Sequence, residues 1–159
     1  MSIRITAALF SITALLAGSA FAAEHVIEPA GTKPSVTGSS KIFTGTVRTD
    51  SVSRPDADSH YSATYVTFEP GARTFWHTHP AGQRLIVLQG RGRVGTDTEV
   101  REIRPGDVVW CPAGVRHWHG ASPETAMTHL ALTNVKDGKN VEWLEAVSDA
   151  DYAKAPGTY

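Results

Sequence analysis

The sequence predicts an all-β fold, an antiparallel sandwich or barrel, for the part of the chain that follows position 41. Between positions 42 and 135 the chain consists of short runs rich in Val, Ile, Thr, Phe, Tyr and Trp, which Gly, Pro and Asp interrupt at nearly regular intervals. The first group of residues favours strands and the second favours turns. Many short strands of even spacing are typical of sandwiches and barrels, not of alternating β and α units.

The region contains a series of predicted strands, and one predicted helix follows them. The strand-like runs are IFTGTVRT (42–49), SATYVTF (62–68), RTFWHTH (73–79), QRLIVLQG (83–90), GRVGT (92–96), VREI (100–103), DVVWCP (107–112), RHWHG (116–120) and MTHLALTNV (127–135). The tail VEWLEAVSDADYAK (141–154) instead has helical periodicity. Its apolar positions on one side of a helix are Val141, Leu144, Val147 and Tyr152. We expect this short C-terminal helix to pack on the outside of the barrel or on a partner subunit.

The first 22 residues have the pattern of a secretory signal peptide. A short start with Arg4 precedes the uncharged apolar run ITAALFSITALLAG, and Ala20 and Ala22 supply small residues at a cleavage site. The apolar run is shorter than the ~20 residues that a membrane-spanning helix needs. We therefore expect cleavage after Ala22 or Ala23, export to the periplasm, and no stable membrane association of the mature protein.

The remaining chain divides into an arm and one domain. Residues 23–41 mix Pro, Gly, Ser and Thr with little periodicity, as an extended N-terminal arm does. Residues 42–159 then form the barrel with its C-terminal helical tail, a length that suits a single core.

Charge and cysteine content exclude some classes of function. Lys and Arg number 15 against 16 Asp and Glu, and no basic run stands out, so nucleic acid is not an expected partner. Cys111 is the one cysteine, so no intramolecular disulfide can form. It lies in the apolar run VVWCP, and we expect it to be a buried small hydrophobic residue.

The stretch FWHTHPAGQ (75–83) places two histidines and a glutamine around a sharp turn. On a strand, His77 and His79 point to the same face about 7 Å apart, so both imidazoles can approach one cation. In a continuing strand Gln83 would lie about 13 Å beyond His79. Pro80-Ala81-Gly82 favours a reversal instead, which brings Gln83 back beside the histidines at the start of the next strand.

A second hairpin repeats this arrangement. Pro112-Ala113-Gly114 forms its turn, and His117 opens the strand that follows. His119 shares the face of His117, and His129 alternates with apolar residues in the next strand, MTHLALT. Five of the seven histidines therefore fall between positions 77 and 129, beside a turn or inside an apolar strand.

The spacing in these two hairpins resembles the two sequence motifs of the cupin family. Gly71-x5-His77-x-His79-x3-Gln83-x6-Gly90 resembles the first motif, in which a glutamate usually stands in place of Gln83. Gly106-x5-Pro112-x-Gly114-x2-His117 resembles the second motif, whose later Asn is replaced by Ala121. The resemblance implies a cupin barrel (a double-stranded β-helix or jelly roll) that holds a divalent metal ion. The implied metal ligands are His77, His79, Gln83 and His117.

A longer likeness, from Phe43 to about Tyr152, resembles the small bacterial cupin hydroxynitrile lyases of the (R)-mandelonitrile lyase type. It is carried by FTGTVR, VTFEPGARTFWHTHPAGQ, PGDVVW, HWHGASPETAMTHLAL and DGK…EW. This resemblance implies manganese as the usual metal, with Fe²⁺, Zn²⁺ and Ni²⁺ as alternatives. It also implies that His119 and His129 are active-site histidines that do not bind the metal. Positions expected to line the pocket and to vary with substrate size are Thr64, Val66 and Thr74.

These features predict a metal-dependent lyase that reversibly cleaves a cyanohydrin, such as mandelonitrile, to an aldehyde and HCN. Because Gln83 is neutral where glutamate is usual, the ion keeps its full +2 charge and is a stronger Lewis acid toward a bound hydroxyl. Either His119 or His129 then takes the hydroxyl proton. The alternatives are a metal-dependent cupin dioxygenase that acts on a phenol or diketone, and a non-catalytic exported protein that binds a small molecule.

Other expectations concern partners and side chains near the site. The partners are a small-molecule substrate and further copies of the chain in a dimer or tetramer. Candidates for the wall of an apolar pocket are Phe75, Trp76, Trp110 and Trp118, although strand alternation turns several of them into the core. Arg73 and Arg84 are candidates to bind an anionic substrate, with exposed strand positions as the commoner role. His25 and His60 are expected in solvent.

Overall fold

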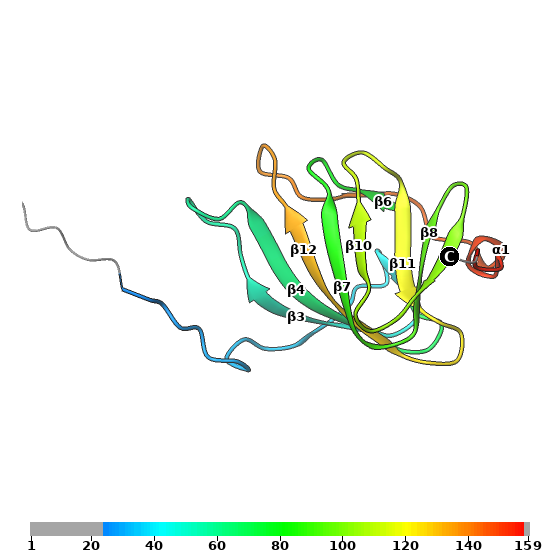
Figure 1. The fold of residues 1–159 in the computed structure, drawn as a ribbon, viewed down its shortest axis with the longest axis horizontal. Helices are drawn as coiled ribbons and strands as arrows, with labels where there is room; N and C mark the ends of the chain where they lie inside the picture. Colours follow the sequence, from blue (N-terminus) through cyan, green and yellow to red (C-terminus); the bar gives the residue numbers. More distant parts are fainter. Residues whose placement is uncertain (1–23, 158–159) are drawn as a thin grey trace, which may run out of the picture.

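Two β-sheets form the body of the molecule in the computed structural model, which describes residues 24–157 (Figure 1). The first sheet has six strands that pair without exception in antiparallel order. In spatial order they are β1 (Val36–Thr37), β3 (Val47–Ser53), β4 (Tyr61–Phe68), β12 (Met127–Asn134), β7 (Gln83–Gly90) and β10 (Val108–Cys111).

The second sheet contains seven strands, most of them short. Five follow one another in the order β13 (Glu142–Trp143), β6 (His77–Thr78), β11 (His117–Ala121), β5 (Arg73–Thr74) and β2 (Phe43–Thr44). The other two, β8 (Gly92–Thr96) and β9 (Val100–Ile103), extend this sheet through the pairing of β8 with β11. The predicted all-β fold is confirmed.

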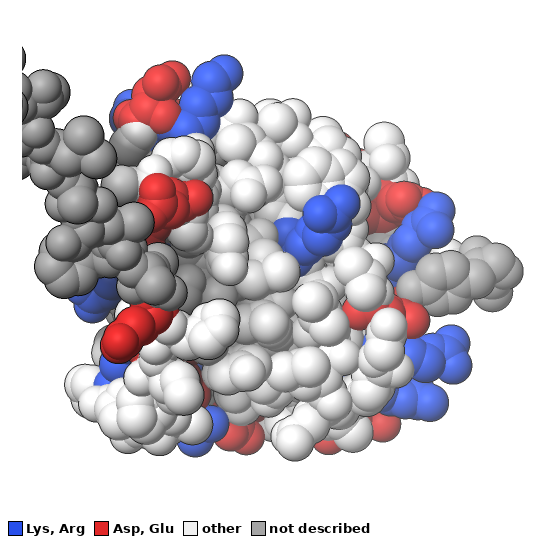
Figure 2. All heavy atoms as spheres, turned by 60° about the vertical axis from the view of Figure 1, so that its left-hand side comes forward, with Lys and Arg blue, Asp and Glu red and all other residues white. Residues whose placement is uncertain are grey.

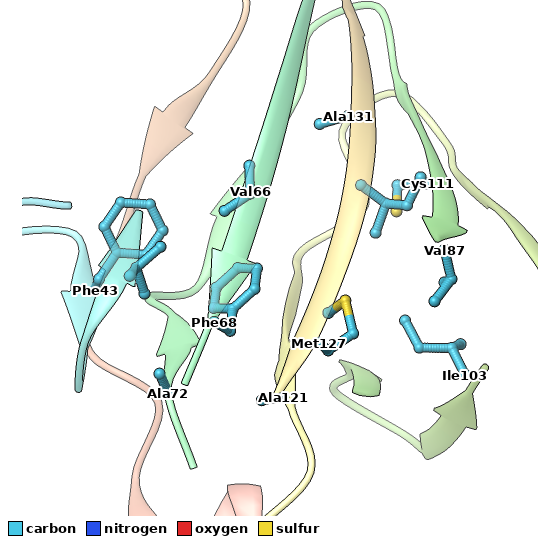
Figure 3. Packing of buried hydrophobic residues seen from close by; sticks show 12 residues of the cluster. Phe43, Val66, Phe68, Ala72, Val87, Ile103, Cys111, Ala121, Met127 and Ala131 are labelled. Carbon is cyan, nitrogen blue, oxygen red and sulfur yellow. The ribbon is translucent and has the colours of Figure 1, made fainter. Parts of the chain in front are cut away.

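Inward-facing side chains of both sheets form one hydrophobic core. Phe68, Leu85 and Met127 come from the first sheet and are almost completely buried, and Phe43 and Ala121 reach the same cluster from the second. Figure 3 shows side chains from both groups of strands pointing into the shared interior. Strand alternation explains this arrangement, since every second residue of β4, β7 and β12 points inward.

Two predicted strands are each divided between separate elements. The run 42–49 becomes β2 and β3, which lie in different sheets, and Gly45 between them has a φ of +78°. The run 73–79 becomes β5 and β6 within one sheet. Between them, the amide of Trp76 donates to the carbonyl of Glu145 at 3.0 Å, so the C-terminal segment pairs here.

The C-terminal helix is shorter than the periodicity of 141–154 predicts. Only α1 (Asp149–Tyr152) is helical, and Ser148 caps it by accepting a hydrogen bond from the amide of Asp151. Glu142 and Trp143 form β13, paired with β6. Helical propensity is overridden here because pairing with a sheet edge satisfies the backbone groups and places Trp143 over the interior.

The helix nevertheless packs on the outside of the second sheet. Val147 and Tyr152 join a second, smaller cluster with Trp76, Val100 and Trp118. The buried guanidinium of Arg73 supports this cluster: it donates to Asp149 Oδ1 at 2.6 Å and lies over the ring of Tyr152. α1 lies at the side of the second sheet, away from β3 and β4 (Figure 1).

The N-terminal arm is exposed and contributes one short strand, β1, to the edge of the first sheet beside β3. The predicted signal peptide, residues 1–22, lies outside the described residues. Among the residues that the structure describes, no helix has the length and hydropathy needed to cross a bilayer. Figure 2 shows a face with a broad area in which charged side chains are sparse, since most of them lie toward its margins.

Candidate metal centre

Three buried histidines come together between the two sheets. His77 lies in β6, His79 directly follows that strand, and His117 opens β11. His77 and His117 are direct partners across the antiparallel pair β6–β11. One ring nitrogen from each histidine lies within 4.8 Å of those of the other two, a spacing that one metal ion can bridge.

The turn before Gln83 has the backbone that the sequence predicts. Gly82 has a φ of +78°, and a Cβ on it would lie 2.4 Å from the Trp110 ring, so a larger residue does not fit. Gln83 then begins β7 and is buried. The amide of Gly114, in the turn of the second hairpin, donates to the carbonyl of His79 at 2.9 Å and ties the two hairpins together.

Backbone carbonyls fix the tautomer of all three histidines. Nδ1 of His77 donates to the carbonyl of Phe75 and Nδ1 of His117 donates to that of Val115, both at 2.9 Å. Nδ1 of His79 donates to the carbonyl of Asn140, which lies 61 residues further along the chain. Because a carbonyl can only accept, each Nδ1 carries the proton and each Nε2 presents a lone pair.

A side-chain hydrogen bond orients the Gln83 amide in the same way. Its Nε2 donates to Oγ1 of Thr133 at 2.9 Å, inside the protein. The amide oxygen is thereby left as the acceptor that faces away from Thr133. Thr133 lies on β12 directly opposite Gln83 in the pairing of β12 with β7.

The donor atoms fit a divalent cation. Nε2 of His79, Nε2 of His117 and Oε1 of Gln83 are buried, and none has a hydrogen-bond partner in the described part of the chain. Leaving a buried acceptor unsatisfied costs about 1–3 kcal/mol, and a metal ion would remove that cost for all three. Neutral imidazole and amide oxygen suit Mn²⁺, Fe²⁺, Ni²⁺ and Zn²⁺, so the donor set itself does not select one metal.

Burial keeps the three imidazoles neutral. Burial lowers the pKa of His117 to about 4. Burial, together with the nearby imidazole of His117, holds the pKa of His77 well below its usual 6.5. Burial also lowers the pKa of His79, partly offset by its hydrogen bond to the Asn140 carbonyl. The Nε2 lone pairs are therefore available at neutral pH, the state that metal binding requires.

A cavity of about 160 Å³ lies beside these side chains. The residues that line it are Phe43, Ser62, Thr64, Val66, Thr74, His77, His79, Gln83, His119, Ala131, Thr133, Asn140, Val141 and Trp143. Its walls come from different sheets, with β4, β7 and β12 on one side and β2, β5, β6, β11 and β13 on the other. The expected wall positions Thr64, Val66 and Thr74 are among its lining residues.

His119 and His129 are in contact, but only His119 lies at the cavity. His119 lines the cavity, and its ring centroid lies 5.2 Å from that of His77. His129 is completely buried behind it, with Nε2 3.1 Å from Nδ1 of His119. Burial lowers the pKa of His129 to about 3. Burial, together with the neighbouring imidazole of His129, holds the pKa of His119 well below its usual range.

Other side chains singled out from the sequence lie elsewhere. None of the four aromatic residues expected at the pocket wall lines the cavity: Trp76 and Trp118 pack in the outer cluster, and Trp110 is 47% exposed. Arg73 is engaged with Asp149, and Arg84 lies over the Trp110 ring. His25 and His60 are exposed, and Cys111 is buried, which raises the pKa of its thiol to about 12.

Sequence reasoning missed the residues that complete the site. Phe43 and Trp143 are the large apolar rings that line the cavity, and Thr133 and Asn140 orient two of the predicted metal ligands, Gln83 and His79. Thr133 has a signal in the sequence, because it shares with His129 the inward face of the run MTHLALTNV. Asn140 acts through its backbone carbonyl, which leaves no trace in the residue type.

Comparison with known proteins places these features in a family. Residues 64–133 match the sequence model of the cupin domain, a range that contains every histidine and the glutamine of the site. The chain is 50% identical over 129 residues to a protein named (R)-mandelonitrile lyase from Granulicella tundricola, covering 80% of this chain and 98% of that protein.

Solved structures show the same fold. A cupin-like protein from Thermotoga maritima superposes with a TM-score of 0.70 at 38% identity, covering 84% of this chain and 98% of the other. A predicted oxalate decarboxylase from the same organism superposes with a TM-score of 0.62 at 17% identity, covering 70% of this chain and all of the other. At that identity the second likeness concerns the fold alone.

Proposed function

Because this chain belongs to the cupin family, we propose that it is a metal-dependent hydroxynitrile lyase, which cleaves an aryl cyanohydrin such as mandelonitrile to an aldehyde and HCN. The observation that supports this most is that His119, which contacts the buried His129, lines a cavity together with His77 and His79, two of the three histidines that could hold a metal ion. The 50% identity to a protein named (R)-mandelonitrile lyase supports the choice of reaction.

We further propose that His77, His79, His117 and Gln83 hold a divalent ion, and that manganese is this ion in the active protein. Such an ion would supply Lewis acidity toward an oxygen-bearing substrate without a redox change. The side chains contribute no negative charge of their own, and three backbone carbonyls hold the imidazole rings in place. This arrangement favours lyase chemistry over oxidation of the substrate.

His119 is the proposed proton acceptor. It lines the cavity, whereas His129 does not, and its Nε2 has no hydrogen-bond partner among the described residues, so we assign the proton transfer to this atom. When Nδ1–H of His119 donates to Nε2 of His129, the Nε2 lone pair of His119 is free. His129 is then a positioning residue, which selects this tautomer and holds the ring.

The chemical step transfers one proton and breaks one carbon–carbon bond. The hydroxyl proton passes to Nε2 of His119, and the electron pair of the O–H bond forms the carbonyl of the aldehyde. The bond to the nitrile carbon breaks, and its electron pair leaves with cyanide. Cyanide takes the proton back from the His119 imidazolium and departs as HCN, which returns the imidazole to its neutral form. Synthesis follows the same steps in reverse.

The experiment that tests this proposal combines metal analysis with an activity assay. We expect the purified protein to retain about one manganese ion per chain and to release equal amounts of benzaldehyde and HCN from mandelonitrile. His117→Ala should lose the metal and the activity together, while the matched variant His60→Gln, at an exposed histidine, should keep both. A manganese-loaded wild type that releases no HCN would exclude the lyase. Oxygen uptake by iron-loaded protein with a phenol or diketone would favour a dioxygenase instead.

A further inference from the structure

We propose that Trp143 is a specificity-determining residue, whose indole ring stacks against the aryl group of the substrate. This inference rests on the proposed lyase function, since it concerns the substrate of that same cavity. It concerns a residue outside the metal ligands and the histidine pair, on a strand that the sequence alone predicts as helix.

The two walls of the cavity differ in the size of their side chains. The first sheet contributes, apart from Gln83, small residues: Ser62, Thr64, Val66, Ala131 and Thr133. Large apolar rings come from the opposite sheet, namely Phe43 on β2 and Trp143 on β13. The space left by the small residues therefore lies against aromatic surface, which suits a flat ring.

The backbone holds Trp143 firmly beside the metal ligands. Trp143 pairs directly with His77 across β13 and β6, and the amide of Leu144 donates to the carbonyl of Trp76 at 2.8 Å. The indole centroid lies 4.8 Å from the ring of His77 and 6.0 Å from that of Phe43. The side chain is only half-buried, so part of the ring is free for a ligand.

The position of the ring relates it to the reacting end of the substrate. A substrate whose oxygen lies near the His77 and His119 nitrogens has its remaining substituent within the same small cavity, next to Trp143. An aromatic pair contributes to binding beyond the apolar area that it buries, by about 2- to 12-fold in affinity. A saturated ring of similar size buries a similar apolar area against Trp143, but it lacks the additional affinity of an aromatic pair.

A binding experiment isolates this contribution from the chemistry. Benzyl alcohol and cyclohexylmethanol, two unreactive alcohols that differ in the ring, are titrated calorimetrically into the manganese-loaded protein. We expect the wild type to prefer benzyl alcohol, Trp143→Leu to lose at least threefold of that preference, and Trp143→Phe to keep most of it. The control Tyr61→Leu, at an exposed aromatic residue outside the cavity, should match the wild type. Metal content and melting temperature are measured on each variant.

Steady-state kinetics with mandelonitrile and the cyanohydrin of cyclohexanecarbaldehyde complete the test. For Trp143→Leu we expect the KM for mandelonitrile to rise about 3- to 10-fold, while kcat for this substrate changes less than about twofold. Both KM and kcat for the saturated cyanohydrin should also change less than about twofold. An unchanged aryl preference in Trp143→Leu, or an equal loss in Trp143→Leu and Trp143→Phe, would overturn the inference even in an active lyase. A wild type that prefers benzyl alcohol through Trp143 but releases no HCN would refute the lyase and leave this binding role standing.

Discussion

The Nε2 atom of His129 lies 3.1 Å from Nδ1 of His119, so a completely buried imidazole contacts the one that lines the cavity. Both rings also pack against Phe68, with centroids at 5.6 and 5.8 Å. His129 is not among the residues that line the cavity. We therefore expect loss of His119 to remove the proton acceptor and loss of His129 to remove only the contact that orients it.

Replacement of the two histidines should separate these roles. We expect His119→Gln to lower kcat by about 10²- to 10⁴-fold, because the proton acceptor is gone. His129→Gln should lower it by about 10- to 100-fold, because the acceptor remains but its tautomer is no longer selected. Rates of HCN release at saturating mandelonitrile measure both effects. Manganese content should stay at the wild-type level, and equal losses in the two variants would contradict the assignment.

Thr133→Val should weaken metal binding although Thr133 is not a ligand. Without the hydroxyl, the Gln83 amide has no partner for its NH₂ group, and its oxygen is no longer held toward the histidines. We expect manganese affinity to fall about 10- to 100-fold, measured by equilibrium dialysis. Thr133→Ser keeps the hydroxyl and is the matched control. If valine and serine variants bind manganese equally well, the hydrogen bond does not orient the ligand.

Gln83→Glu should keep the metal and lose activity. A carboxylate binds a divalent ion at least as well as an amide, but it cancels one of the two positive charges that polarise the substrate hydroxyl. We expect kcat to fall roughly tenfold or more at unchanged manganese content. Turnover equal to that of the wild type would show that the neutrality of Gln83 is unimportant for the reaction.

The metal-free protein should lose stability as the pH falls below about 6.5. Burial holds the pKa of His117 at about 4 and that of His129 at about 3, whereas unfolded histidine titrates near 6.5. Between these values the unfolded chain binds more protons than the folded one, so the free energy of unfolding decreases with falling pH. Each such histidine contributes up to about 1.4 kcal/mol per pH unit.

Urea unfolding of the metal-free protein at pH 7.5, 6.0 and 5.0 checks this expectation. His129→Gln should flatten the dependence, and His60→Gln, at an exposed position, should leave it unchanged. Manganese should restore stability at pH 6.0 by competing with protons for the Nε2 atoms. Equal unfolding free energies at pH 7.5 and 5.0 in the metal-free wild type would exclude buried neutral histidines.

The strands and the placing of His77 beside His79 could be predicted because both follow from local rules, whereas the approach of His117, which pairs with His77 across β6 and β11, is implied by the resemblance to the cupin motifs. Residues i and i+2 of a strand share a face, which places His77 near His79 and His117 near His119. The Pro-x-Gly turns then fix where each returning strand begins, and Gly82 has the positive φ that this requires. These relations extend over a few residues, so the sequence contains them in full.

The parts that could not be predicted depend on contacts distant in the sequence. The tail from Val141 has helical periodicity, but its pairing with β6 is decided by the free edge of a strand more than 60 residues earlier. For the same reason the sequence suggests neighbours of the predicted ligands as candidates for the aromatic wall, namely Phe75, Trp76, Trp110 and Trp118, and does not point to Trp143. Alternation also turns two of those rings outward, because Trp118 lies between the inward-facing His117 and His119, and Trp76 directly precedes the inward-facing His77.

Among the three histidines of the predicted metal centre, His79 differs from the others in the location of the backbone carbonyl that accepts its Nδ1 hydrogen bond. The rings of His77 and His117 are held by carbonyls two residues earlier in the chain, in the segments that lead directly into β6 and β11. His79 instead depends on Asn140, just after a tight turn in which Asp137 and Gly138 both have positive φ. Opening of that turn would free one imidazole while two remain fixed. If these histidines hold a metal ion, the contribution of His79 would therefore depend on the order of this turn, whereas those of His77 and His117 would not.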